Sequence, residues 1–400
     1  MGKVVAMINK ETLRLIREKT QVSFDYLSKK NNQDVSVIEG WEDIGSPDCL
    51  PSILQAKKLA YSLHVPFAGL YMPPHLIPIP ALPNLHNKRT MPGGVAIDNS
   101  RLNLAIIDIL KAREFLIETS KELNRSFTLF SLAMTGSNVK KWADFIRSEL
   151  SLSIQDQYKC SSPRQYYLYL RNKVENCGVF IQCFNGVPVE EVRGLAVYYD
   201  YLPVIGLNEK DRPPAKSFSI IHELVHLMKR ASMVCNDMYE VKSTDQEEVF
   251  CNAVAGEVLV PEGALRRELH SYNSTEINLA TVERIANRFS VSKEVIIRRM
   301  IDVAPPIITT SQYQAVNSEI QIKLQMQKEM NEEMEKAGIK LPFGISASRN
   351  AMDTNSHQIG RIILSGYEEG LFSRNDIARY LGINEKNATD YLIEVSKWNS

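Results

Sequence analysis

The stretch Phe218-Ser-Ile-Ile-His-Glu-Leu-Val-His-Leu-Met228 is the part of this chain that decides its interpretation. Almost every residue outside its His-Glu-x-x-His string is apolar, and Pro213 and Pro214 stand where a helix can begin. The pattern therefore predicts a helix that is apolar nearly all round and buried. His222 and His226 are four residues apart, so both imidazoles should project from one face of that helix.

Two neutral imidazoles at this spacing can bind one Zn²⁺, and Glu223 can act as a general base on a metal-bound water. Burying two imidazoles and a carboxylate among apolar residues is costly unless they are paired or coordinate a metal. The alternatives are a chance string, or a core helix whose histidines are satisfied by ordinary hydrogen bonds. We predict a zinc site with His222 and His226 as ligands and Glu223 as the catalytic residue.

A second helical segment, Thr244–Pro261, offers a third protein ligand. Glu247 and Glu248 lie near its start. A favourable interaction with the helix dipole at the N-terminus would explain the presence of one of them, but hardly of both. Thr244 and Glu247 have the spacing of a capping box, which gives Glu247 a structural role. Glu248 and Asn252 share one helix face. We therefore predict Glu248 as the third zinc ligand and Asn252 as the acceptor for the free ring N–H of one histidine.

Three segments of the chain resemble the ImmA/IrrE-type zinc metallopeptidases of bacteria and mobile elements: Val187–Asn208, His222–His226 and Glu248–Pro261. The resemblance is strong over about residues 160–305 and extends to most of the chain through a common architecture. The family usually has Phe where Val254 stands, a departure that affects packing rather than chemistry.

The resemblance implies a gluzincin-like fold in which a partly exposed strand around Tyr198–Asn208 pairs with an extended peptide substrate. It also implies a zinc-dependent endopeptidase that cleaves a repressor or another helix-turn-helix regulator in a stress, phage or mobile-element response. A zinc peptidase needs a donor for the developing oxyanion. Tyr198, Tyr199 and Tyr239 are candidates for this role, although each can equally be an ordinary strand or packing tyrosine.

We expect a mainly helical α+β chain with a small sheet. Short helices are predicted after Asn9, Ser23, Asp34 and Pro51, in an order that resembles the XRE class of helix-turn-helix domain. The expected parts are residues 1–72 as this domain, 73–100 as a proline-rich linker, 101–305 as the zinc metallopeptidase domain and 306–400 as a C-terminal helical domain. Strands are predicted in the stretches 179–184, 194–199 and 203–207.

The bulk composition favours no strongly charged partner. Lys and Arg together number 47, as do Asp and Glu, so no overall field points to nucleic acid or to an anionic membrane. The six cysteines show no paired metal-ligand spacing, and free thiols in a chain of this size suggest a reducing cytosol. We see no apolar run long enough to span a bilayer, so we expect a cytoplasmic protein without a membrane partner.

DNA binding through residues 9–70 is an open alternative to protein binding. The expected recognition helix, Gln33–Asp43, contains four acidic residues and no Lys or Arg, whereas groove binding needs phosphate neutralisation. The rival to the endopeptidase hypothesis is therefore a transcriptional regulator or antitoxin whose peptidase domain acts as a sensor or binding platform. The regulator or antitoxin would bind a toxin-like partner. The endopeptidase would instead cleave a repressor.

Overall fold

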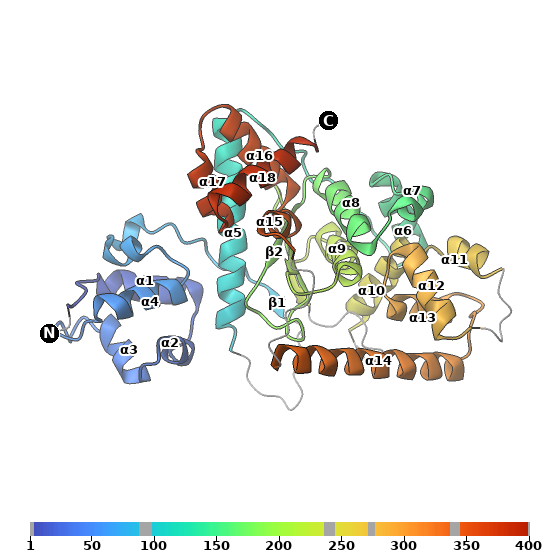
Figure 1. The fold of residues 1–400 in the computed structure, drawn as a ribbon, viewed down its shortest axis with the longest axis horizontal. Helices are drawn as coiled ribbons and strands as arrows, with labels where there is room; N and C mark the ends of the chain where they lie inside the picture. Colours follow the sequence, from blue (N-terminus) through green and yellow to red (C-terminus); the bar gives the residue numbers. More distant parts are fainter. Residues whose placement is uncertain (1–3, 88–97, 236–244, 271–276, 337–344, 399–400) are drawn as a thin grey trace.

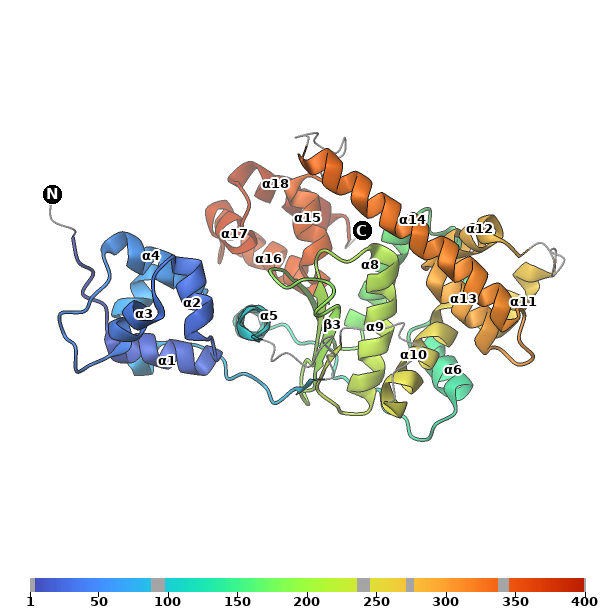
Figure 2. The ribbon, with the colours of Figure 1, turned by 90° about the horizontal axis from the view of Figure 1, so that it is seen from below.

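A computed structural model describes residues 4–87, 98–235, 245–270, 277–336 and 345–398, and all structural statements below concern these residues. The chain is mainly helical and contains one small mixed sheet, as expected for the α+β class. Figures 1 and 2 show the N-terminal helices as a separate lobe, with one long helix between them and the sheet. None of the described helices is both long and apolar enough to cross a membrane.

The N-terminal lobe consists of short helices whose starts are set by local side chains. Asn9, Ser23 and Ser52 each accept a hydrogen bond from a backbone N–H in the first turn of the helix that follows. The elements are α1 (Lys10–Thr20), α2 (Phe24–Asn31), α3 (Val35–Glu42), α4 (Ile53–Ser62), and the 3₁₀ turns η1 (Phe67–Tyr71) and η2 (Pro74–Leu76). Their order agrees with the helices expected from sequence, whereas assignment to the XRE class remains a prediction.

Helix α5 (Ser100–Glu122) connects the lobe to the rest of the protein (Figure 1). Leu104 and Ile107 belong to the apolar core of the N-terminal lobe. Ile106 and Ile109, on the same helix, belong to a second core that also includes the sheet and the C-terminal helices. Because α5 serves two cores, its apolar residues are spread around much of its circumference.

The sheet has the strand order β1-β5-β3-β4-β2. Strand β3 is antiparallel to both β4 and β5, while β2 is parallel to β4 and β1 is parallel to β5. The strands are β1 (His86–Asn87), β2 (Phe180–Phe184), β3 (Gly194–Val197), β4 (Val204–Asn208) and β5 (Met233–Cys235). The three strands expected from sequence are present, whereas the short strands β1 and β5 were not anticipated.

The expectation of a partly exposed strand at Tyr198–Asn208 is wrong. Strand β4 lies between β3 and β2, and all five of its residues are buried. Val204 belongs to the core on the α5 side of the sheet, and Ile205 belongs to the core that also contains the apolar residues of α9 (Pro213–Met228). A strand covered on both faces has an almost continuous apolar sequence, and this run cannot be distinguished from an edge strand by sequence pattern alone.

The remaining helices surround the sheet and the metal-binding motif. Those of the central region are α6 (Val139–Glu149), α7 (Ile154–Lys159), α8 (Pro163–Glu175), α9 (Pro213–Met228), α10 (Gln246–Leu259), α11 (Glu262–Leu269), α12 (Leu279–Phe289) and α13 (Lys293–Asp302). The long helix α14 (Thr310–Lys336) follows. The C-terminal helices are α15 (Ala347–Thr354), α16 (His357–Glu368), α17 (Arg374–Leu381) and α18 (Glu385–Ser396).

Candidate metal centre

Helix α9 carries the His-Glu-x-x-His string at the centre of the main core. Its N-terminus begins with Pro213, and every residue from Ala215 to Met228 is buried. The helix packs on one face of the sheet against β3 and β4 and on its other sides against α8 and α10. The expected buried helix is therefore present, and its burial removes the two imidazoles from water.

The two histidine side chains lie together and face one glutamate of α10. The Nε2 atoms of His222 and His226 are 3.1 Å apart. Glu248 Oε2 is 3.2 Å from His222 Nε2, and Glu248 Oε1 is 3.4 Å from His226 Nε2. All three side chains are buried. Among the described residues they are the group that could hold a metal ion.

The donor set and its spacing fit Zn²⁺. Zinc in proteins is bound tetrahedrally by His nitrogen and carboxylate oxygen at about 2.0–2.2 Å, which places neighbouring ligand atoms roughly 3.3 Å apart. The three separations between His222, His226 and Glu248 are 3.1, 3.2 and 3.4 Å. An uncompensated cluster of this kind would be costly to bury, and a divalent cation between the three atoms compensates it.

The pKa shifts of His226 and Glu248 also suit metal binding. Burial lowers the pKa of His226, although the hydrogen bond to Glu248 opposes this shift. Burial raises the pKa of Glu248, but the hydrogen bonds and charge of His222 and His226 outweigh it, and the net pKa lies below the ordinary value. The deprotonated carboxylate and neutral imidazole favoured in this way are the forms that ligate a metal.

The start of α10 separates the two neighbouring glutamates. The N-cap is Asp245, whose side chain accepts a hydrogen bond from the backbone N–H of Glu247. The capping box expected between Thr244 and Glu247 is therefore replaced by this cap, and Thr244 lies outside the described residues. The Glu247 carboxylate lies 3.6 Å from Lys229 Nζ, and its side chain is partly exposed. Glu248, one residue later, is turned towards the histidines.

Glu223 lies beside Gly194 of β3. The Glu223 side chain is buried, and a Cβ atom placed on Gly194 would lie only 2.6 Å from Glu223 Oε1. Residue 194 must therefore be glycine for the carboxylate to keep this position. The sequence placed Gly194 at the start of a strand but gave no sign of its approach to Glu223, because the approach depends on the packing of α9 across β3.

The expected hydrogen bond from a histidine ring N–H to Asn252 Oδ1 is not formed in the structure. Asn252 Oδ1 and His222 Nδ1 are buried polar atoms without a hydrogen-bond partner among the described residues. The other ring is contacted by Cys251, whose Sγ lies 3.8 Å from His226 Nδ1. The supporting role of Asn252 stays a prediction.

The tyrosines proposed as oxyanion donors have other partners where they can be described. Tyr198 donates a hydrogen bond from its hydroxyl to Asp200 Oδ1 at 3.1 Å. The guanidinium of Arg113 in α5 lies 4.0 Å from the centre of the Tyr199 ring, which places Tyr199 on the α5 side of the sheet. Tyr239 lies outside the described residues. No role in catalysis follows for Tyr198 or Tyr199 from these contacts.

Comparison with known families agrees with this site. Residues 186–300 match the model of a peptidase family, Peptidase M78, described as the IrrE N-terminal-like domain. The match includes β3, β4, α9 and α10, and thus all three predicted ligands, but it covers less than half of the chain. No curated protein matches the chain significantly. The match supports a relation to the ImmA/IrrE family and a peptidase role for this part of the protein.

Proposed function

We propose that this protein is a zinc-dependent endopeptidase in which His222, His226 and Glu248 hold the metal. The observation that carries the proposal is the convergence of their three ligand atoms at separations of 3.1, 3.2 and 3.4 Å. A bound Zn²⁺ would polarise the scissile carbonyl and lower the pKa of the attacking water. The family match to residues 186–300 supports peptide hydrolysis over other metal-assisted hydrolyses.

Glu223 is the proton carrier in this proposal. Its carboxylate follows a predicted ligand directly in sequence and is buried in the same helix. A buried carboxylate beside the attacking water can accept its proton and donate it to the leaving amine nitrogen. Gly194 leaves the space that the carboxylate needs. The apolar residues of α9 exclude bulk water from the other sides of the site.

For the substrate we propose a repressor or another helix-turn-helix regulator, cleaved in a stress, phage or mobile-element response. This finer proposal rests on the resemblance to the ImmA/IrrE-type peptidases rather than on a contact in the site.

The test is to incubate the purified, zinc-loaded protein with candidate regulators and to sequence any new N-termini. The Glu223→Gln variant is the matched control. We expect cleavage at defined positions by the wild type and none by the variant. Equal cleavage by both proteins, or cleavage that survives removal of the metal by a chelator, would refute the proposed chemistry.

A further inference from the structure

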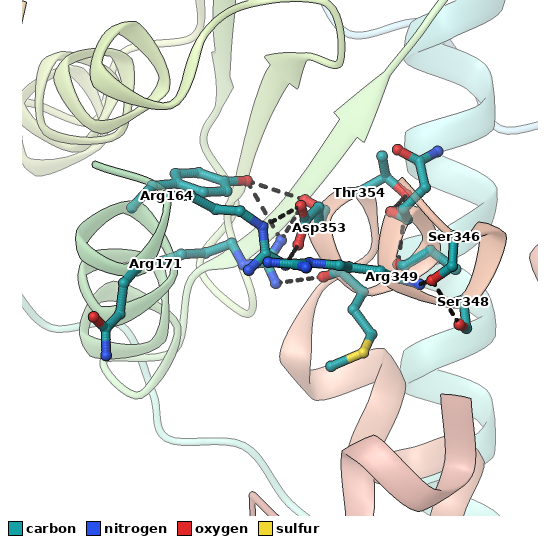
Figure 3. Close-up of polar contacts among 12 residues, drawn as sticks. Arg164, Arg171, Ser346, Ser348, Arg349, Asp353 and Thr354 are labelled. Atoms are coloured by element: carbon teal, nitrogen blue, oxygen red, sulfur yellow. Dashed lines mark hydrogen bonds and ion pairs between the residues drawn. The ribbon is translucent and has the colours of Figure 1, made fainter. Parts of the chain in front are cut away.

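The C-terminal helices are held on helix α8 by a buried polar network (Figure 3). Arg171 of α8 is buried and donates hydrogen bonds to the backbone carbonyls of Met352 and Asp353, both at 2.8 Å. Arg164, two turns earlier, forms an ion pair with the Asp353 carboxylate, and its Nε is 2.7 Å from Oδ2. These contacts fix the C-terminal end of α15 against α8.

The last turn of α8 extends this network to α16. The buried Glu175 accepts a hydrogen bond from the backbone N–H of His357 and lies 2.8 Å from His357 Nδ1. Its backbone carbonyl accepts a hydrogen bond from the Gln358 side-chain amide at 2.9 Å. Since α8 also packs along the metal-binding helix α9, the C-terminal helices are connected to the metal site through one rigid element.

A surface hollow of about 410 Å³ opens at this junction. It lies between the end of α8, one side of α16 along its whole length, and the segment that follows α5. Gly178, with φ of +85°, fixes one wall, because a Cβ there would lie 2.1 Å from the Thr128 carbonyl oxygen. The close backbone packing at Gly178 means that this wall is preformed rather than shaped by a ligand.

The side chains that line the hollow include cations without a carboxylate partner. Arg125 and Arg361 both face it, and no salt bridge of either one occurs among the described residues. Ser126, Thr128 and Ser365 are further lining residues. Two guanidinium groups provide more donors than one carboxylate can accept, and they suit the three oxygens of a phosphate group.

The rim of the hollow also offers an acceptor that a bare phosphate would not use. The exposed Glu368 carboxylate lies there. An ionised carboxylate accepts hydrogen bonds and cannot donate them. A ligand that satisfies it carries hydroxyl groups beside its phosphate.

We propose that this hollow is a binding site for a small phosphate ester that carries hydroxyl groups, such as a sugar phosphate or a nucleoside monophosphate. Arg125 and Arg361 bind the phosphate, and Glu368 accepts hydrogen bonds from the hydroxyls. The bound molecule bridges the end of α8, one side of α16 and the segment after α5. Its binding therefore stabilises the attachment of the C-terminal helices to the peptidase part.

The test uses calorimetric titration of the full-length protein with AMP and glucose 6-phosphate, with adenosine, glucose and inorganic phosphate as comparison ligands. At least one ester should bind saturably with a Kd below about 1 mM, the upper end of the usual range for metabolites. It should also raise the midpoint of thermal unfolding by a few degrees, as expected for a ligand that binds only the folded state. The unphosphorylated compounds should not bind.

Arg125→Gln and Arg361→Gln should each weaken binding of the ester about tenfold, the usual effect of losing one charge-assisted hydrogen bond. Arg349→Gln is the matched control, since Arg349 is an exposed arginine of the C-terminal helices that does not line the hollow. Arg125 is exposed, so its variant tests the site even if the half-buried Arg361 proves necessary for folding. Absence of ester binding, equal binding of inorganic phosphate, or unchanged affinity in both variants would overturn the proposal.

Discussion

Substitution of Gly194 by alanine should displace the Glu223 carboxylate and leave metal binding unchanged. The added methyl group would lie 2.6 Å from Glu223 Oε1, 3.2 Å from its Cγ and 3.3 Å from its Cδ. Ordinary contact distances begin at about 3.5 Å. The carboxylate must therefore move by roughly 0.9 Å, because Gly194 is held in a strand with hydrogen-bonded neighbours on both sides.

The expected loss is mainly in catalysis. A displacement near 1 Å of a catalytic group costs on the order of 100-fold in rate. The nearest atoms to the new methyl group all belong to Glu223 and none to the proposed metal ligands His222, His226 and Glu248, so metal content should be unchanged. Overpacking of a buried site costs about 1–3 kcal/mol of stability, partly offset by about 0.4–1 kcal/mol from a stiffer unfolded chain.

The assay is kcat/KM on the substrate identified by N-terminal sequencing, together with zinc content and the midpoint of thermal unfolding. Gly263→Ala is the matched control, because its methyl group would meet only Arg267 Nη1, at an ordinary 3.6 Å. The Gly194 variant should lose about 100-fold in kcat/KM while it remains folded and metal-loaded. Wild-type kcat/KM in a folded, zinc-loaded Gly194→Ala protein would refute the argument that β3 positions Glu223.

Three other predictions concern the metal site and the N-terminal lobe. Glu223→Gln should keep the fold and bound zinc but abolish peptide cleavage, because an amide cannot take a proton from water; cleavage by this variant at the wild-type rate would exclude Glu223 as the base. Glu248→Ala should lose zinc in metal analysis of the purified protein. Glu247→Ala should keep its zinc and lose at most about 1 kcal/mol, since Glu247 makes a partly exposed ion pair; the reverse pattern would exchange the two roles. Duplex DNA binding by residues 9–70 should be weak and should depend on basic residues outside α3, since Asp34–Asp43 contains no Lys or Arg. Fluorescence anisotropy at physiological salt measures this binding. Tight, sequence-specific binding that is lost on substitution within α3 would contradict the prediction.

Local signals in the sequence were sufficient for much of the helical structure. Asn9, Ser23 and Ser52 cap the helices that follow them, because a short polar side chain satisfies backbone donors only a few residues away. The placement of α10 was correct, but its cap is Asp245 rather than Thr244.

The sequence by itself determined the buried helix with His222, Glu223 and His226, because a spacing of four residues places two side chains on one helical face whatever surrounds them. Only the tertiary structure decided how closely Gly194 approaches Glu223 and that β4 lies inside the sheet. The attachment of the C-terminal helices through Arg171 and Glu175 was likewise decided only by the tertiary structure. Each of these features joins residues far apart in the chain, and their positions depend on how whole helices and strands pack rather than on local preference.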